Sequence, residues 1–118
     1  YLSPERAADL GVAKVSLDEL IARSDFVSLH APLTEATRGI IDAASLARMK
    51  EGVIVVNCAR GGLVVEADLK AALISGHVAA AAIDVFAEEP ARDNVLFGDV
   101  ILYTDLQIQD ILVAGEKL

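Results

Sequence analysis

The segment that decides the fold reads Val53-Ile54-Val55-Val56-Asn57-Cys58-Ala59-Arg60-Gly61-Gly62. It opens with an apolar, β-branched run that ends in a single amide. Such a run is typical of a parallel strand that is covered on both faces. Two further apolar runs, at residues 79–84 and 100–103, are predicted to be strands for the same reason. The segment therefore indicates a buried parallel sheet.

Capping residues and glycine stops predict helices around these strands. The predicted helices cover residues 4–10, 17–23, 42–49 and 66–75. Short strands are predicted at residues 12–15 and 25–30, the second closed by Pro32 because proline cannot continue the ladder. This alternation with short links predicts an α/β fold, a parallel sheet with flanking helices and right-handed crossovers.

The composition favours one soluble α/β domain. The 118 residues are 54% hydrophobic but only 4% aromatic, and the net charge is −8. That charge would repel phosphate backbones and anionic lipid surfaces, so neither nucleic acid nor a membrane is an expected partner. The single cysteine excludes an internal disulfide, and no signal peptide or long apolar run is present. We expect a cytoplasmic protein without a metal site.

Ligands of open parallel sheets bind beyond the carboxyl ends of the strands. Four polar clusters are expected there: His30-Ala31-Pro32, Asn57 to Gly62, Asp84 with Glu88-Glu89-Pro90, and Thr104-Asp105. The second cluster is the most informative, because the forked guanidinium of Arg60 lies on a glycine-bearing turn and suits two-point binding of a carboxylate. The competing interpretation is an ordinary solvated arginine.

Motifs in these clusters resemble a known family. They are Asn57-Cys58-Ala59-Arg60-Gly61-Gly62-Leu63-Val64, then Gly76-His77, then Ala82-Ile83-Asp84-Val85-Phe86-Ala87-Glu88-Glu89-Pro90. Upstream stand Ser28-Leu29-His30-Ala31-Pro32-Leu33-Thr34 and Thr37-Arg38-Gly39-Ile40-Ile41. Over residues 1–98 the chain resembles the D-2-hydroxyacid dehydrogenases, and within them the D-3-phosphoglycerate dehydrogenases. The resemblance implies a single partial nucleotide-binding domain, Rossmann-like and half of a doubly wound sheet, with a divergent tail over residues 99–118.

The resemblance also implies roles for individual residues. Arg60 matches the arginine that binds the substrate carboxylate and polarises the keto group, and Glu89 matches the glutamate that orients the catalytic histidine. Asp84 matches the aspartate that holds the nicotinamide carboxamide. The residues expected to contact NAD are His30, Ala31, Pro32, Cys58, Ala59, Arg60 and Asp84. Among their neighbours, Glu88 is expected to be a bystander and His77 a surface residue, and His30 is not expected to be the acid–base group.

Two departures from the family pattern bear on activity. The family's Gly-x-Gly-x-x-Gly turn and ribose-binding aspartate are absent, and Asp105 stands where the family has its histidine. A carboxylate with a pKa of about 4 is a poor proton donor at neutral pH. We therefore expect a fragment or derivative of an NAD-dependent oxidoreductase of serine biosynthesis, an enzyme that acts on a small D-2-hydroxy acid. The chain itself is expected to be inactive alone and to form a homo-oligomer. The rival hypotheses are a non-catalytic α/β scaffold and a residual ligand-binding or interaction module.

Overall fold

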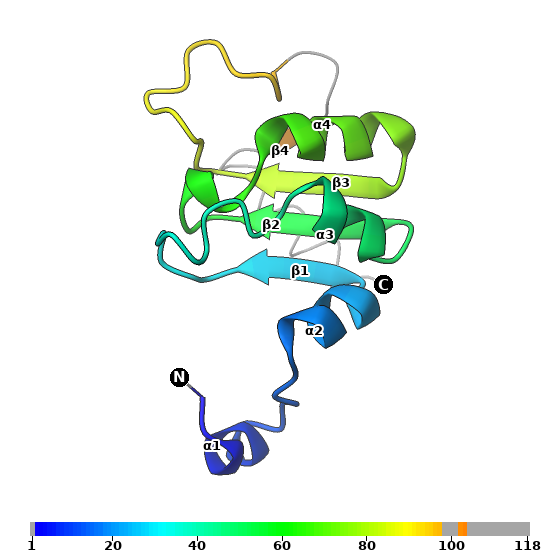
Figure 1. The fold of residues 1–118 in the computed structure, drawn as a ribbon, viewed down its shortest axis with the longest axis vertical. Helices are drawn as coiled ribbons and strands as arrows, with labels where there is room; N and C mark the ends of the chain where they lie inside the picture. The colour runs from blue at the N-terminus through cyan, green and yellow to red at the C-terminus, as the bar shows by residue number, and fades with distance from the viewer. Residues whose placement is uncertain (1, 98–101, 104–118) are drawn as a thin grey trace.

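The computed structural model describes residues 2–97 and 102–103, and in these ranges the strands form one parallel sheet. The strand order is that of the chain, β1 (Phe26–Leu29), β2 (Val53–Asn57), β3 (Val78–Ile83) and β4 (Leu102–Tyr103) (Figure 1). In the register, Val27 lies opposite Val55, and Val55 lies opposite Ala81. The predicted α/β class and parallel sheet are confirmed.

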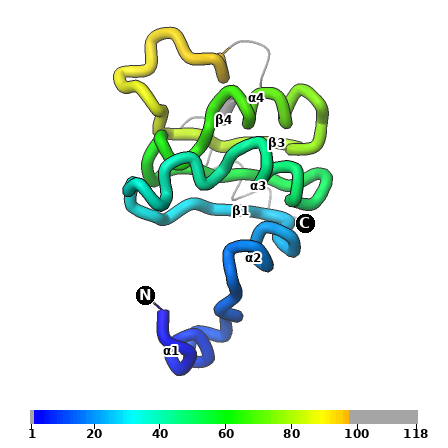
Figure 2. Tube along the Cα trace, viewed as in Figure 1, coloured from blue at the N-terminus to red at the C-terminus, as the bar shows by residue number. Residues whose placement is uncertain are grey.

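The helices are α1 (Pro4–Asp9), α2 (Leu17–Arg23), α3 (Ala43–Arg48) and α4 (Glu66–Ser75), with a short 3-10 helix η1 (Gly61–Leu63). Both α3 and α4 lie on one face of the sheet and pack against each other, whereas α1 lies apart beyond α2 (Figure 2). Each crossover between β1, β2 and β3 therefore passes over the same face. This arrangement leaves the connections after the strands at one end of the sheet.

The helix ends follow the predicted capping chemistry. Ser3 and Ser16 each accept a hydrogen bond from a backbone N–H in the first turn of the helix that they precede. Asp42 accepts from the N–H of Ser45, whose hydroxyl accepts in turn from the N–H of Asp42, which completes a capping box. Gly76 ends α4 in the left-handed conformation, with φ of 81°.

The predicted strand at Val12–Val15 is wrong. These residues have no regular secondary structure, and the N–H of Val12 donates to the carbonyl of Ala7, which folds the chain back onto α1. A run of four residues has few ladder hydrogen bonds to gain, so a local turn prevails. β3 begins and ends one residue before the prediction. Thr104, Asp105 and the rest of the predicted tail, apart from Leu102 and Tyr103, lie outside the described residues.

The hydrophobic core lies between the sheet and the helices α3 and α4. Side chains on one face of β2, such as Val55, are fully buried and pack with Leu46 and Leu69 from the two helices. The other face of β2 is only half-buried, and Phe26 on β1 is 60% exposed. Among the described residues, the prediction that both faces of β2 are covered is therefore confirmed for one face only. No helix in those ranges has the length and apolarity needed to cross a bilayer.

Candidate functional site

A pocket of about 380 Å³ lies at the carboxyl ends of the strands, where parallel-sheet proteins bind ligands. Its lining comes from the connections that follow β1, β2 and β3. The lining residues are Leu33, Ala59, Arg60, Gly61, Gly62, Val85, Phe86, Ala87 and Glu89. The structure thus brings the two predicted catalytic residues, Arg60 and Glu89, to one pocket, although they follow different strands.

The missing side chain of Gly61 makes this meeting possible. A Cβ atom on Gly61 would lie 1.9 Å from the carbonyl carbon of Phe86 and 2.5 Å from the nitrogen of Ala87. Only glycine permits backbone to approach backbone so closely. The turn after β2 therefore lies directly against the segment that leads to Glu89.

A buried amide braces the Arg60 turn. Asn57, which is fully buried, donates from Nδ2 to the carbonyl of Arg60 at 2.9 Å and accepts at Oδ1 from the N–H of Ala59 at 3.1 Å. Its carbonyl also accepts from the N–H of Asp84, at 3.1 Å. Asn57 thus links the ends of β2 and β3. Asn57 had no predicted role of its own, although a single amide at the end of an apolar run was a usable signal.

The charged side chains of the pocket are exposed to solvent. Arg60 uses Nη1 to donate to the carbonyl of Ala59 at 2.7 Å, and a guanidinium carries five N–H donors in all. Glu89 accepts at Oε1 from the N–H of Phe86 at 2.9 Å. Glu88 lines not this pocket but a neighbouring one of about 460 Å³, together with Arg92. The pocket therefore offers a forked cation and a carboxylate at the carboxyl end of the sheet.

The remaining residues predicted to contact NAD lie at the same end of the sheet. Asp84 follows β3 directly, and Cys58 follows β2 and is exposed. The turn His30-Ala31-Pro32 follows β1, and Nε2 of His30 lies 2.9 Å from the hydroxyl of Ser28. These residues do not line the Arg60–Glu89 pocket, but Leu33, the next residue of that turn, does.

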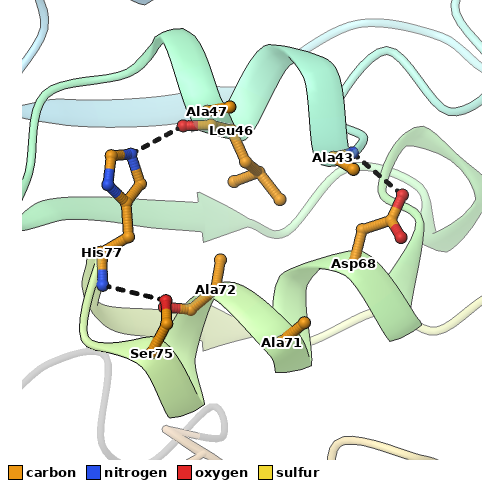
Figure 3. A pocket seen from close by; sticks show the side chains of 8 residues that line it. All are labelled: Ala43, Leu46, Ala47, Asp68, Ala71, Ala72, Ser75 and His77. Atoms are coloured by element: carbon orange, nitrogen blue, oxygen red, sulfur yellow. Dashed lines mark hydrogen bonds between the residues drawn. The ribbon is translucent and has the colours of Figure 1, made fainter.

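His77 lies at the opposite end of the sheet, before β3. It is half-buried rather than a plain surface residue, and its Nε2 is 2.8 Å from the carbonyl oxygen of Leu46. Figure 3 shows it at one end of a pocket between α3 and α4, with Asp68 at the other end. The chain has two histidines, and neither lines the pocket that holds Glu89. In the described ranges no three His, Cys, Asp or Glu residues are grouped so that they could hold a metal.

Comparisons with known proteins identify the family and agree with the fold. Residues 1–104 match the model of the family described as "D-isomer specific 2-hydroxyacid dehydrogenase, NAD binding domain". The chain is 58% identical over 97 residues to the D-3-phosphoglycerate dehydrogenase of Mycobacterium tuberculosis. The aligned region covers 82% of this chain but only 18% of that relative. The chain thus spans less than a fifth of that relative's length.

Two solved structures show the same fold. The apo D-mandelate dehydrogenase of Rhodotorula graminis is 37% identical with a TM-score of 0.80, over 92% of this chain and 32% of that one. The NAD-complexed D-isomer specific 2-hydroxyacid dehydrogenase of Lactobacillus delbrueckii ssp. bulgaricus is 34% identical with a TM-score of 0.71, over 78% of this chain and 27% of that one.

Proposed function

We propose that this chain, which belongs to the NAD-binding domain family of the D-isomer specific 2-hydroxyacid dehydrogenases, forms one wall of a catalytic site. At this site hydride would pass between NAD and a D-2-hydroxy acid. The observation that carries this proposal is the shared pocket of Arg60 and Glu89 at the carboxyl ends of β2 and β3. A forked cation is suited to bind the carboxylate of a 2-oxo acid, and a second carboxylate is suited to assist the proton transfer.

Arg60 is the proposed substrate-binding residue. Its guanidinium would hold the substrate carboxylate through two parallel hydrogen bonds and draw electron density from the adjacent keto oxygen. Because the relative with 58% identity is a D-3-phosphoglycerate dehydrogenase, we propose D-3-phosphoglycerate as the substrate, and with it a role in serine biosynthesis.

The strand ends fit the nicotinamide part of NAD. Asp84 is exposed directly after β3, and its carboxylate is a natural acceptor for the N–H groups of a carboxamide. The turn His30-Ala31-Pro32 and the backbone near Ala59 would line the same part. When bound, NAD would supply the hydride acceptor for oxidation of the hydroxy acid. The chain contains no Gly-x-Gly-x-x-Gly turn for the diphosphate.

Glu89 is the proposed partner of the acid–base group. A carboxylate beside an imidazole holds the ring in one orientation and favours its protonated form. Neither histidine of the chain lines the pocket of Glu89. We therefore propose that residues 1–118 alone lack the proton donor of the reaction.

The native protein that carries this chain, purified from its source, provides the test. We expect NADH-dependent reduction of 3-phosphohydroxypyruvate, with lower kcat/KM for hydroxypyruvate and glyoxylate, which lack the phosphate. The proposal would be contradicted if none of these three 2-oxo acids led to oxidation of NADH. Absence of any thermal shift with NADH would then favour a scaffold over a ligand-binding module.

A further inference from the structure

Glu66, the first residue of α4, joins the helix to both ends of the segment that carries Glu89. Its Oε1 accepts from the N–H of Ala87 at 2.7 Å, and its Oε2 accepts from Nδ2 of Asn94 at 2.7 Å. Residues 87–94 have no helix or strand of their own. The two oxygens of one side chain thus hold this segment near its beginning and at its end.

The Asn94 end of the segment is also tied to the core. Oδ1 of Asn94 accepts from the N–H of Leu96 at 2.9 Å, and the side chain of Leu96 is fully buried in the main hydrophobic cluster. At the other end, Glu89 accepts from the N–H of Phe86, beside the close approach of Gly61. The segment is therefore anchored on both sides of Glu89.

The chemistry of the contact requires a carboxylate. Both partners of Glu66 are donors, a backbone N–H and an amide NH₂, so the side chain between them must accept twice. An acid at the start of a helix also interacts with the helix dipole, but that effect depends on its charge and does not require these two hydrogen bonds. Asp68, in the same first turn, instead accepts from the N–H of Ala43 at 2.9 Å, at the start of α3.

We propose that Glu66 is a positioning residue, which holds residues 87–94 so that Glu89 faces the pocket of Arg60. This inference rests on the proposed dehydrogenase function, because Glu89 acts there on proton transfer. Glu66 does not line the pocket of Arg60 and Glu89, so it acts through the segment and not on the substrate.

An exchange of functional groups tests the proposal. Glu66→Gln leaves one donor facing a donor, and Asn94→Asp places two carboxylates side by side, so each single variant loses a hydrogen bond. In the double variant, the NH₂ group introduced by Glu66→Gln would donate to the new carboxylate, while the amide oxygen beside it still accepts from Ala87, so both bonds return. Asp68→Asn is the matched control, since an amide oxygen still accepts the single N–H of Ala43.

The first measurement is hydrogen exchange of the backbone amides of Ala87 and Phe86 in the native protein. We expect each single variant to raise their exchange rates by roughly tenfold or more, as for the loss of one charge-assisted hydrogen bond. The double variant should return toward the wild-type rate, and Asp68→Asn should not change it. Unchanged rates in Glu66→Gln, or no recovery in the double variant, would overturn the proposed contact.

The second measurement is steady-state kinetics with NADH and a 2-oxo acid. In each single variant kcat should fall by about tenfold while KM changes little, because Glu89 serves proton transfer and Arg60 binds the carboxylate. The double variant should recover kcat. Raised exchange with normal kcat would overturn the positioning role and leave the dehydrogenase function standing. An inactive wild-type protein would overturn the proposed function itself, before any variant is compared.

Discussion

Gly61 and Phe86 lie so close that a Cβ atom on Gly61 would stand 1.9 Å from the carbonyl carbon of Phe86. This contact joins the connection after β2 to the connection after β3. It sets the relative position of Arg60, which precedes the glycine, and Glu89, whose carboxylate is bonded to the N–H of Phe86. The geometry of the site therefore depends on a position that has no side chain.

Gly61→Ala should destabilise the protein. The added methyl group meets backbone, which can move only by displacing the whole connection, so we expect a loss of about 1–3 kcal/mol. Gly62→Ala is the matched control, because its methyl group meets the flexible end of Leu33, at 2.9 Å. Urea unfolding measures both variants, and equal midpoints for the two would show that the Gly61 contact is not needed.

Arg60→Ala should lower kcat/KM of the native protein by about a hundredfold or more, since the two proposed hydrogen bonds to the substrate carboxylate contribute roughly 1.5–3 kcal/mol each. Arg60→Lys should recover only part of this loss, because an ammonium keeps the charge but not the fork. Arg23→Ala, which removes an exposed ion pair with Glu19 on α2, serves as the control. An Arg60→Ala protein with normal kcat/KM would assign substrate binding to another residue.

The contribution of Asp42 to stability should depend on pH. The N–H of Ser45, which donates to the Asp42 carboxylate in the capping box, lowers the pKa of Asp42 below its usual value of about 3.9. A lowered folded-state pKa gives stability that is present above the unfolded-state pKa and is lost as pH falls through the folded-state pKa. We therefore expect the stability difference between wild type and Asp42→Asn to change only below about pH 4.

Urea midpoints of the two proteins between about pH 2 and 7 would measure this difference. Because other carboxylates titrate in the same range, only the change in the difference between the proteins reports on Asp42. A difference that stays constant across this range would contradict the assignment of the lowered pKa to the capping box.

The isolated polypeptide of residues 1–118 should bind NAD with a Kd weaker than about 1 mM, a binding free energy of only about −4 kcal/mol. The reason is that Asp84 and the strand ends provide for the nicotinamide, whereas no glycine-rich turn is present for the diphosphate. No turnover of D-3-phosphoglycerate is expected either. Titration calorimetry that gave a micromolar Kd would favour the residual ligand-binding module.

The same isolated polypeptide should self-associate. In the described part of the sheet β1 is an end strand, and Phe26 on it is 60% exposed, so an open edge and an apolar side chain are presented together. Light scattering at micromolar concentration should show a dimer, and Phe26→Lys should shift it toward monomer. Ile74→Lys, the same change at a residue of α4 that is 66% exposed, should have less effect. A monomeric wild type would mean that this edge is covered within the chain.

The local elements could be predicted from the sequence alone. The run Val53–Asn57 is β2 with the predicted bounds, and Glu66–Ser75 is α4 with Gly76 as its C-cap. These signals act between residues a few positions apart, through side-chain caps and backbone preference, and so they can be identified without knowledge of the fold. Val12–Val15 shows the limit, because a strand forms only when a partner strand pairs with it.

The arrangement of the site depends on tertiary packing. The motifs predicted that Arg60 and Glu89 would share it, but its geometry depends on the backbone contact of Gly61 with Phe86 and on the buried amide of Asn57. The role of Glu66 could not be predicted, since as a sequence feature it is an ordinary acid in the first turn of a helix. Its two partners, Ala87 and Asn94, lie 21 and 28 residues further along the chain, beyond β3. Contacts between residues distant in the chain arise from packing, and local sequence preferences do not encode them.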